Sequence, residues 1–153
     1  MSGPSRAPAH VAWLGYGGLV PFVATALGAL LDPAHRLFWQ LALLAYGAVI
    51  LSFVGALHWA LAMQEEDTPA ARASFVWSVV PALAGWVALL LPMLLVQGRV
   101  LAAVLLIAAF GAHYWHDKRL ARRRALPAWY LPLRLQLSSV ACLCVATVPY
   151  ALA

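Results

Sequence analysis

Five long stretches without a formal charge divide this sequence, and they constrain its fold more than any other feature. They cover residues 11–31, 37–64, 73–98, 100–116 and 135–153. About 20 apolar residues in a helix cross the roughly 30 Å hydrocarbon core of a bilayer. Of the 153 residues 65% are hydrophobic and 10% are charged, whereas soluble domains carry about 25% charged residues. The composition therefore excludes a soluble globular domain.

The pattern predicts an all-α fold, an integral membrane bundle of five transmembrane helices. Backbone groups in lipid must pair within their own segment, and no strict alternation of polar and apolar residues favours a barrel. We expect one membrane domain over 1–153, with spans at about 11–31, 37–63, 73–96, 100–116 and 134–152. The fourth span is the weakest, because His113 and His116 fall in its last turns. It crosses only if Tyr114 and Trp115 lie at headgroup level.

The distribution of lysine and arginine predicts the orientation of the bundle. With five crossings, one face holds eight of these residues: Arg6, Arg72, Lys118, Arg119, Arg122, Arg123, Arg124 and Arg134. The other face holds Arg36 and Arg99. The positive-inside rule then predicts a cytoplasmic N-terminus, a cytoplasmic loop over 117–132 and a C-terminus outside.

The first apolar stretch has a competing interpretation as a cleaved signal peptide. Arg6 precedes it, and residues 24–26 (Ala-Thr-Ala) resemble a cleavage site. However, the stretch continues to Leu31, is interrupted by Pro21 and is rich in glycine and aromatic residues, which favours a retained span. Only ten residues precede it and one of them is arginine, unlike a mitochondrial transit peptide. We therefore expect a multi-pass protein of the bacterial inner (cytoplasmic) membrane.

Small residues at helical spacing predict where the helices pack closely, because helix association in lipid relies on close backbone approach. The second span has Ala48, Ser52, Ala56 and Ala60, with Gly47 and Gly55 beside them; the third has Ser74, Ser78, Ala82 and Gly85; the fifth has Ser139, Cys142 and Ala146. We expect these three helices to form the tight core. Pro21, Pro81 and Pro92 are predicted kinks or helix ends.

The usual signatures of catalysis are absent from the sequence. No phosphate-binding loop, zinc-protease motif or nucleophile elbow occurs, so no enzyme mechanism is expected. Cys142 and Cys144 lie on roughly opposite faces of one helix and cannot pair with each other, so packing is their expected role. The basic cluster adjoins a span, which favours anionic lipid headgroups over nucleic acid as its partner. The residues concerned are Lys118, Arg119, Arg122, Arg123 and Arg124.

Four segments resemble a known family. They are Leu14–Phe22 (LGYGGLVPF), Tyr46–Trp59 (YGAVILSFVGALHW), Ser78–Trp86 (SVVPALAGW) and Pro127–Arg134 (PAWYLPLR). Together they are similar to the domain of unknown function 3429 family, which comprises small membrane proteins like transmembrane protein 69. The match departs at Ala56 and Ala60, where the family pattern has glycine. The resemblance implies a multi-helix protein of an energy-transducing membrane without an established activity.

Ionisable residues inside a span are costly, so each one requires a partner or a function. His58 lies about five residues, or roughly 7 Å, inside the predicted cytoplasmic end of the second span. His113 lies at a comparable depth in the fourth span, Arg134 opens the fifth, and His116 and Asp117 stand at the membrane boundary. The candidate cofactor-binding residues are His58, His113, Arg134 and Trp59; no catalytic residue and no metal ligand is expected.

Three functions fit this pattern. In the first, the buried histidine and arginine are structural, and the protein is a non-enzymatic accessory, assembly or structural component that contacts other membrane proteins. In the second, the cytoplasmic-side histidine and arginine cluster binds a haem, a quinone or a lipid. In the third, the protein is a small transporter or channel, which would have to be oligomeric because the outer half of the spans has few polar residues.

Overall fold

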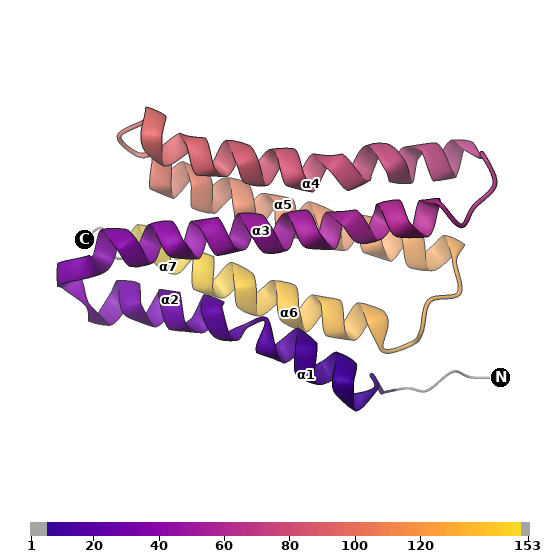
Figure 1. Ribbon diagram of the computed structural model, residues 1–153, viewed down its shortest axis with the longest axis horizontal. Coiled ribbons are helices and arrows are strands. Elements are labelled where there is room, and N and C mark those ends of the chain that lie inside the picture. Colours follow the sequence, from indigo (N-terminus) through magenta and orange to yellow (C-terminus); the bar gives the residue numbers. More distant parts are fainter. Residues whose placement is uncertain (1–5, 151–153) are drawn as a thin grey trace.

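Five helical segments lie side by side along the long axis of the molecule, as Figure 1 shows for this computed structural model. The structure describes residues 6–150, which contain helices and no strand. Each segment has 21 to 30 residues and is long and apolar enough to cross a membrane. The elements are α1 (Ala9–Gly17), α2 (Val20–Leu31), the 3₁₀ turn η1 (Pro33–His35), α3 (Arg36–Ala62), α4 (Pro69–Leu94), α5 (Gly98–Arg123), α6 (Tyr130–Val145) and α7 (Thr147–Tyr150). The predicted all-α membrane bundle of five helices is confirmed.

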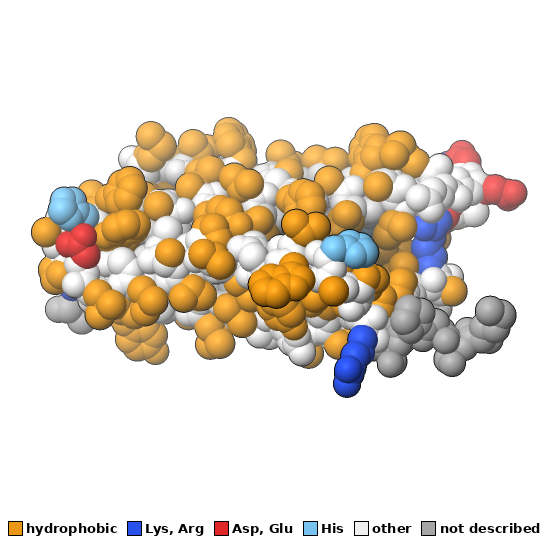
Figure 2. All heavy atoms as spheres, turned by 60° about the horizontal axis from the view of Figure 1, so that its bottom comes forward, with side chains coloured by type: hydrophobic (Ala, Val, Ile, Leu, Met, Phe, Trp, Pro, Cys, Tyr) orange, Lys and Arg blue, Asp and Glu red, His pale blue; other side chains and the backbone are white. Residues whose placement is uncertain are grey.

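The surface of the bundle is apolar along most of its length, as expected of a protein whose solvent is lipid. Figure 2 shows hydrophobic side chains over the middle of one face, with charged side chains toward the ends. Val96, Met93 and Trp13 are among the most exposed large side chains, whereas Leu43, Leu51 and Leu106 are fully buried.

One end of the bundle collects the N-terminal part of α1, the α3–α4 connection and the α5–α6 connection, while α7 lies at the other end (Figure 1). We call the first the basic end, because all eight lysines and arginines predicted to lie inside are on these segments or within two helical turns of them: Arg6, Arg72, Lys118, Arg119, Arg122, Arg123, Arg124 and Arg134. Arg134 lies in the second turn of α6. That the basic end faces the cytoplasm stays a prediction.

Two predicted boundaries are corrected. The fourth span, predicted over 100–116, is a helix from Gly98 to Arg123, so residues 117–123 are not part of a loop. The fifth, predicted to begin at Arg134, begins at Tyr130, and its predicted end at residue 152 lies outside the described residues. Both errors arise because a charged residue, Asp117 in one case and Arg134 in the other, was taken as the limit of a span. Asp117 is instead fully buried among protein donors, so the helix continues through it.

Close backbone approach joins α3 to α4, which share the most extensive contact in the bundle. A Cβ added at Gly55 would lie 2.9 Å from the Ser78 carbonyl oxygen, and one at Gly85 would lie 3.1 Å from that of Ala48. Only small residues permit this distance.

The predicted small-residue stripes are only partly correct. Ala48 and Ser78 are buried, but Ala56 and Ala60 are exposed, and so is Ser139 on α6. After α3 and α4, it is α5 that packs most extensively in the core, not α6. The prediction fails because lipid-facing and protein-facing residues are equally apolar. The spacing of small residues therefore does not show which face of a helix points into the bundle.

The first segment is broken at the predicted position. α1 ends at Gly17 and α2 begins at Val20, with Pro21 in its first turn. Proline lacks a backbone N–H and cannot continue the preceding hydrogen-bond pattern. The Tyr46 hydroxyl on α3 donates to the Gly18 carbonyl oxygen at 2.9 Å, which satisfies one acceptor at the break.

The end opposite to the basic end has its own buried polar contact. Arg99 Nη1 donates to Gln40 Oε1 at 2.6 Å, and Gln40 Nε2 donates to the Val148 carbonyl oxygen at 3.2 Å. Gln40 is fully buried, so these two bonds satisfy its side-chain amide. They tie the start of α3 to α5 and α7.

Candidate functional site

Asp117 is the centre of a buried polar cluster that joins three helices. It lies on α5 with no exposed surface. His58 Nε2 on α3 is 2.9 Å from its Oδ1, Tyr130 OH on α6 donates to the same oxygen at 3.2 Å, and Arg134 Nε donates to Oδ2 at 2.9 Å. Because a carboxylate only accepts, the proton of this contact lies on His58 Nε2. The Asp117 and Arg134 charges balance each other.

His113 extends the cluster to α4. It stands one helical turn before Asp117, and its Nε2 is 3.7 Å from Asp117 Oδ1, which is too long for a hydrogen bond. Trp77 Nε1 donates to His113 Nδ1 at 3.3 Å. Since Nδ1 accepts, the proton of the neutral ring lies on Nε2, which is buried and has no partner.

Asp117 is the residue that the candidate site lacked. It was expected only at the membrane boundary, at a depth similar to that of His58 and Arg134, and was not included among the binding residues, yet it is the hub of the cluster. A signal was present, because Asp117 is the one acidic residue in the helix Gly98–Arg123 and follows His113 by four positions, on the same helix face. Tyr130, the third donor, was not among the candidate residues.

The other candidate residues divide into two groups. His58, His113 and Arg134 are brought together around Asp117. Trp59 is not: its side chain is 47% exposed and its ring meets Phe75 edge-on at 4.9 Å. His116 stacks on Trp77, with ring centroids 3.6 Å apart, on the side of α5 that faces α4.

A haem does not fit between the two buried histidines. The His58 and His113 ring centroids are 5.0 Å apart in edge contact, which leaves no gap for a porphyrin. The same rings and Asp117 place three ligand-type atoms within 4.8 Å of one another. However, Nε2 of each ring carries its proton, and Arg134 occupies Asp117 Oδ2. In the structure this carboxylate accepts hydrogen bonds from His58, Tyr130 and Arg134.

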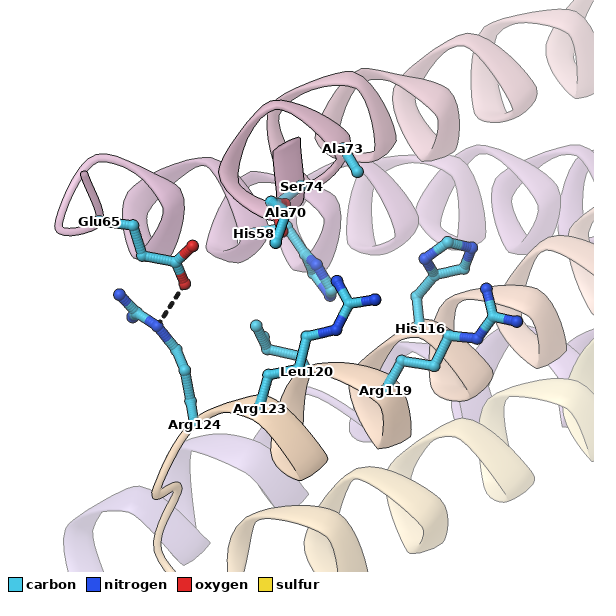
Figure 3. A pocket seen from close by; sticks show the side chains of 10 residues that line it. All are labelled: His58, Glu65, Ala70, Ala73, Ser74, His116, Arg119, Leu120, Arg123 and Arg124. Carbon is cyan, nitrogen blue, oxygen red and sulfur yellow. Dashed lines mark hydrogen bonds and ion pairs between the residues drawn. The ribbon is translucent and has the colours of Figure 1, made fainter. Parts of the chain in front are cut away.

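A pocket of about 500 Å³ opens above the cluster at the basic end (Figure 3). The buried His58 borders it, and arginines from the last turns of α5 line it together with the first turns of α4. The lining residues are His58, Glu65, Ala70, Ala73, Ser74, His116, Arg119, Leu120, Arg123 and Arg124. We call this the arginine pocket.

The charges of the arginine pocket are unbalanced. Glu65 Oε1 accepts from Arg124 Nε at 2.6 Å, and this ion pair neutralises one of the three arginines of the pocket. The Arg119 guanidinium carbon lies 3.4 Å from the centroid of the Trp115 ring, a cation–π contact. Within residues 6–150 no carboxylate pairs with Arg119 or Arg123. The pocket therefore attracts an anionic group.

Comparison with known proteins identifies the family. The family model described as "Protein of unknown function (DUF3429)" matches residues 7–149. The chain belongs to the DUF3429 family. The resemblance seen in the four sequence segments is thereby confirmed, and the match covers every residue of the Asp117 cluster and the arginine pocket.

A curated DUF3429-like relative supports the same assignment. Transmembrane protein 69 of Xenopus tropicalis is 36% identical over 137 residues, which are 88% of this chain and 51% of that protein. The chain thus spans about half the length of this relative. No solved structure matches the chain. The family and the five helices together establish a multi-pass membrane protein.

Proposed function

We propose that this DUF3429 protein is a non-enzymatic membrane protein that binds the phosphate group of an anionic lipid in the arginine pocket. The observation that carries the proposal is the cavity of about 500 Å³ that Arg119 and Arg123 border without a carboxylate partner in the described chain. Phosphate oxygens accept bidentate hydrogen bonds from guanidinium groups, and such charge-assisted bonds are the strong ones.

The neighbouring backbone favours the same ligand. Ala70, Ala73 and Ser74 bring the first turns of α4 to the wall of the pocket. The N-terminus of a helix carries a partial positive charge, which attracts anions over about one turn. An anion in the pocket would thus be near two guanidinium groups and one helix N-terminus.

The place of the pocket in the membrane also fits a lipid headgroup. The pocket lies at the end of the apolar segments, where headgroups begin, and the basic end is predicted to face the anionic cytoplasmic leaflet. We also propose that this membrane is the bacterial inner membrane, as the sequence predicts. Lys118 and Arg122 border a smaller hollow of about 140 Å³ beside Trp115 and Arg119. They would add diffuse attraction to anionic lipids without belonging to the arginine pocket.

Native mass spectrometry of the protein with phosphatidylglycerol tests the proposal. Arg123→Gln removes a pocket guanidinium, and Arg122→Gln removes the same charge from the neighbouring position outside the pocket. A hydrogen bond to a charged group contributes about 1.5–3 kcal/mol, so we expect Arg123→Gln to weaken binding at least about tenfold. Arg122→Gln should weaken it less than about fivefold, as a diffuse surface charge does.

The control lipid is phosphatidylcholine, whose headgroup has no net charge. A parent protein that binds both lipids equally would contradict the proposal. Equal losses in Arg122→Gln and Arg123→Gln would contradict the assignment to the pocket and leave only diffuse electrostatic attraction.

A second candidate function is an accessory component of a larger membrane complex. The exposed face of α3 supports this function. It carries Ser52, Ala56 and Ala60 at intervals of one helical turn; the two alanines are exposed and Ser52 is partly exposed. Small residues at this spacing on a lipid-facing helix permit close contact with a helix of another protein. Mild solubilisation should then retain a larger complex, and Ala56→Phe should dissociate it, whereas Val104→Phe on the exposed face of α5 should not. A lone monomer in gentle detergent would count against this function.

A transporter receives no support from the single chain. Between the two polar ends, the described core consists of apolar side chains such as Leu44, Leu51 and Leu106. Such a layer offers no polar route for an ion.

A further inference from the structure

A second cavity, of about 150 Å³, lies inside the membrane-spanning part of the bundle, where the break between α1 and α2 faces α3, α5 and α6. Nearly all of its wall is apolar, and three phenylalanines contribute to it: Phe22, Phe53 and Phe110. We call this cavity the crevice. It is distinct from the arginine pocket, with which it shares no lining residue.

The crevice is open to the lipid on one side. Phe22 and Phe110 in its wall are 1% and 2% exposed, whereas Leu14 and Phe53 are 77% and 65% exposed. Buried residues therefore form its floor, and lipid-facing residues form its rim. A molecule dissolved in the bilayer would reach the crevice sideways from among the acyl chains.

Glycines at the helix break keep the crevice free of side chains. Gly15 and Gly18 both line it. A Cβ at Gly15 would approach the Leu137 side chain to 3.2 Å and narrow the space. The Tyr46 hydroxyl bond to the Gly18 carbonyl holds the break in place.

One charged side chain borders this apolar space, and it has an unused donor. Arg134 lines the crevice and is 8% exposed. Its Nε donates to Asp117, and the rest of its guanidinium group forms no hydrogen bond within the described chain. A buried donor left unsatisfied is unfavourable, so an acceptor at this position would be bound. Ser138, one turn further along α6, adds a hydroxyl to the same wall.

The charge balance indicates what kind of acceptor fits. Asp117 already neutralises Arg134, so a second anion in this apolar space would be uncompensated. A neutral carbonyl oxygen would accept from the guanidinium group without adding a charge. A planar ring would pack against the phenylalanines, and an apolar cavity of about 150 Å³ accommodates a benzene ring in another protein.

We propose that the crevice binds the head ring of a lipid-soluble quinone, with a ring carbonyl accepting a hydrogen bond from the Arg134 guanidinium group. The isoprenoid or alkyl tail leaves through the rim beside Leu14 and Phe53 into the lipid. This site is independent of the arginine pocket. The ester carbonyl of a phospholipid has the same acceptor chemistry, so the test must separate the two sources.

The probe is decylubiquinone, titrated into the detergent-purified protein, with bound quinone and retained phosphatidylcholine both measured after gel filtration in quinone-free detergent. Ser138→Leu fills the crevice, and the matched control Ser139→Leu places the same side chain on the exposed face of the same helix. We expect Ser138→Leu to lower quinone affinity at least tenfold and Ser139→Leu to leave it within twofold. Arg134→Lys keeps the charge beside Asp117 but replaces the planar guanidinium fork by a single ammonium nitrogen, which cannot reach both Asp117 and the crevice, so it should lower affinity about tenfold or more.

The outcomes are distinct. The site is supported if the parent binds decylubiquinone and Ser138→Leu loses this binding while Ser139→Leu keeps it. Loss of quinone binding in a folded Arg134→Lys variant supports it as well. Equal affinity in parent and Ser138→Leu, or equal losses in Ser138→Leu and Ser139→Leu, would overturn it. If the parent binds no decylubiquinone but retains phosphatidylcholine that Ser138→Leu loses, the occupant is a phospholipid ester and the quinone assignment is wrong.

Discussion

Replacing Asp117 by asparagine removes the negative charge that His58, Tyr130 and Arg134 share, while keeping the shape of the side chain. The amide oxygen can still accept hydrogen bonds, but Arg134 loses its counter-ion at 2.9 Å in a site where both side chains are at least nine-tenths buried. Removing one partner of a buried ion pair costs about 3–5 kcal/mol, because the other charge remains in a low-dielectric site. We therefore expect Asp117→Asn to lower the free energy of unfolding by about that amount.

Equilibrium unfolding in mixed detergent micelles, followed by tryptophan fluorescence, measures this change. The chain has seven tryptophans, and Trp77 contacts the cluster directly. For a chain of about 150 residues, the expected loss corresponds to a fall in Tm of at least about 6 °C.

Asp67→Asn is the matched control, because it makes the same chemical change at an exposed ion pair with Arg72. The Arg72 guanidinium holds the pKa of Asp67 below its ordinary value of 3.8. This pair is therefore intact at neutral pH and is lost only as the pH falls through that lowered pKa. Because both groups are in water, Asp67→Asn should leave Tm unchanged within error.

The double variant Asp117→Asn/Arg134→Gln separates the ion pair from other effects. If the two groups interact as the structure indicates, the double variant is less destabilised than the sum of the two single variants by about 0.5–3 kcal/mol. Additive losses, or an Asp117→Asn protein as stable as its parent, would refute the argument that this ion pair holds α5 to α6.

Two further predictions concern stability and use the same unfolding measurement. Tyr130→Phe should cost about 1.5 kcal/mol, because it deletes one hydrogen bond to the Asp117 carboxylate, and no change would show that the bond contributes nothing. Gly55→Ala should cost about 1–3 kcal/mol, since its Cβ would meet the Ser78 carbonyl at 2.9 Å, whereas Gly111→Ala, with open space around it, should stabilise α5 by up to about 1 kcal/mol. Equal effects at the two glycines would contradict the close packing of α3 on α4.

The sequence predicted the number of helices correctly because lipid imposes a simple requirement. Charged residues interrupt the apolar stretches, and a stretch of about 20 residues has one stable structure in a bilayer. The break near Pro21 could also be predicted, since the missing N–H is a local property of the chain.

The contacts of Asp117 could not be predicted from the sequence in this way. A charged residue near the end of a span was taken as the start of a loop, but its partners lie 59, 17 and 13 positions away along the chain. Whether a charge is buried depends on which helices lie beside it. Lateral order does not follow from the pattern of one helix.

For a related reason, the sequence did not predict which face of each helix is buried. In water, the apolar face of a helix is the packed face, but in lipid both faces are apolar. Thus Ala56 and Ala60 looked equivalent to Ala48, although only Ala48 is buried. The crevice and the arginine pocket depend on contacts among several helices, so no segment of the sequence predicts them.

A structure of the protein in phosphatidylglycerol nanodiscs tests the proposed lipid site most directly. We expect a lipid phosphate in the arginine pocket, within hydrogen-bond distance of the Arg119 and Arg123 guanidinium groups. An empty pocket, with phosphates instead gathered at Lys118 and Arg122, would contradict it.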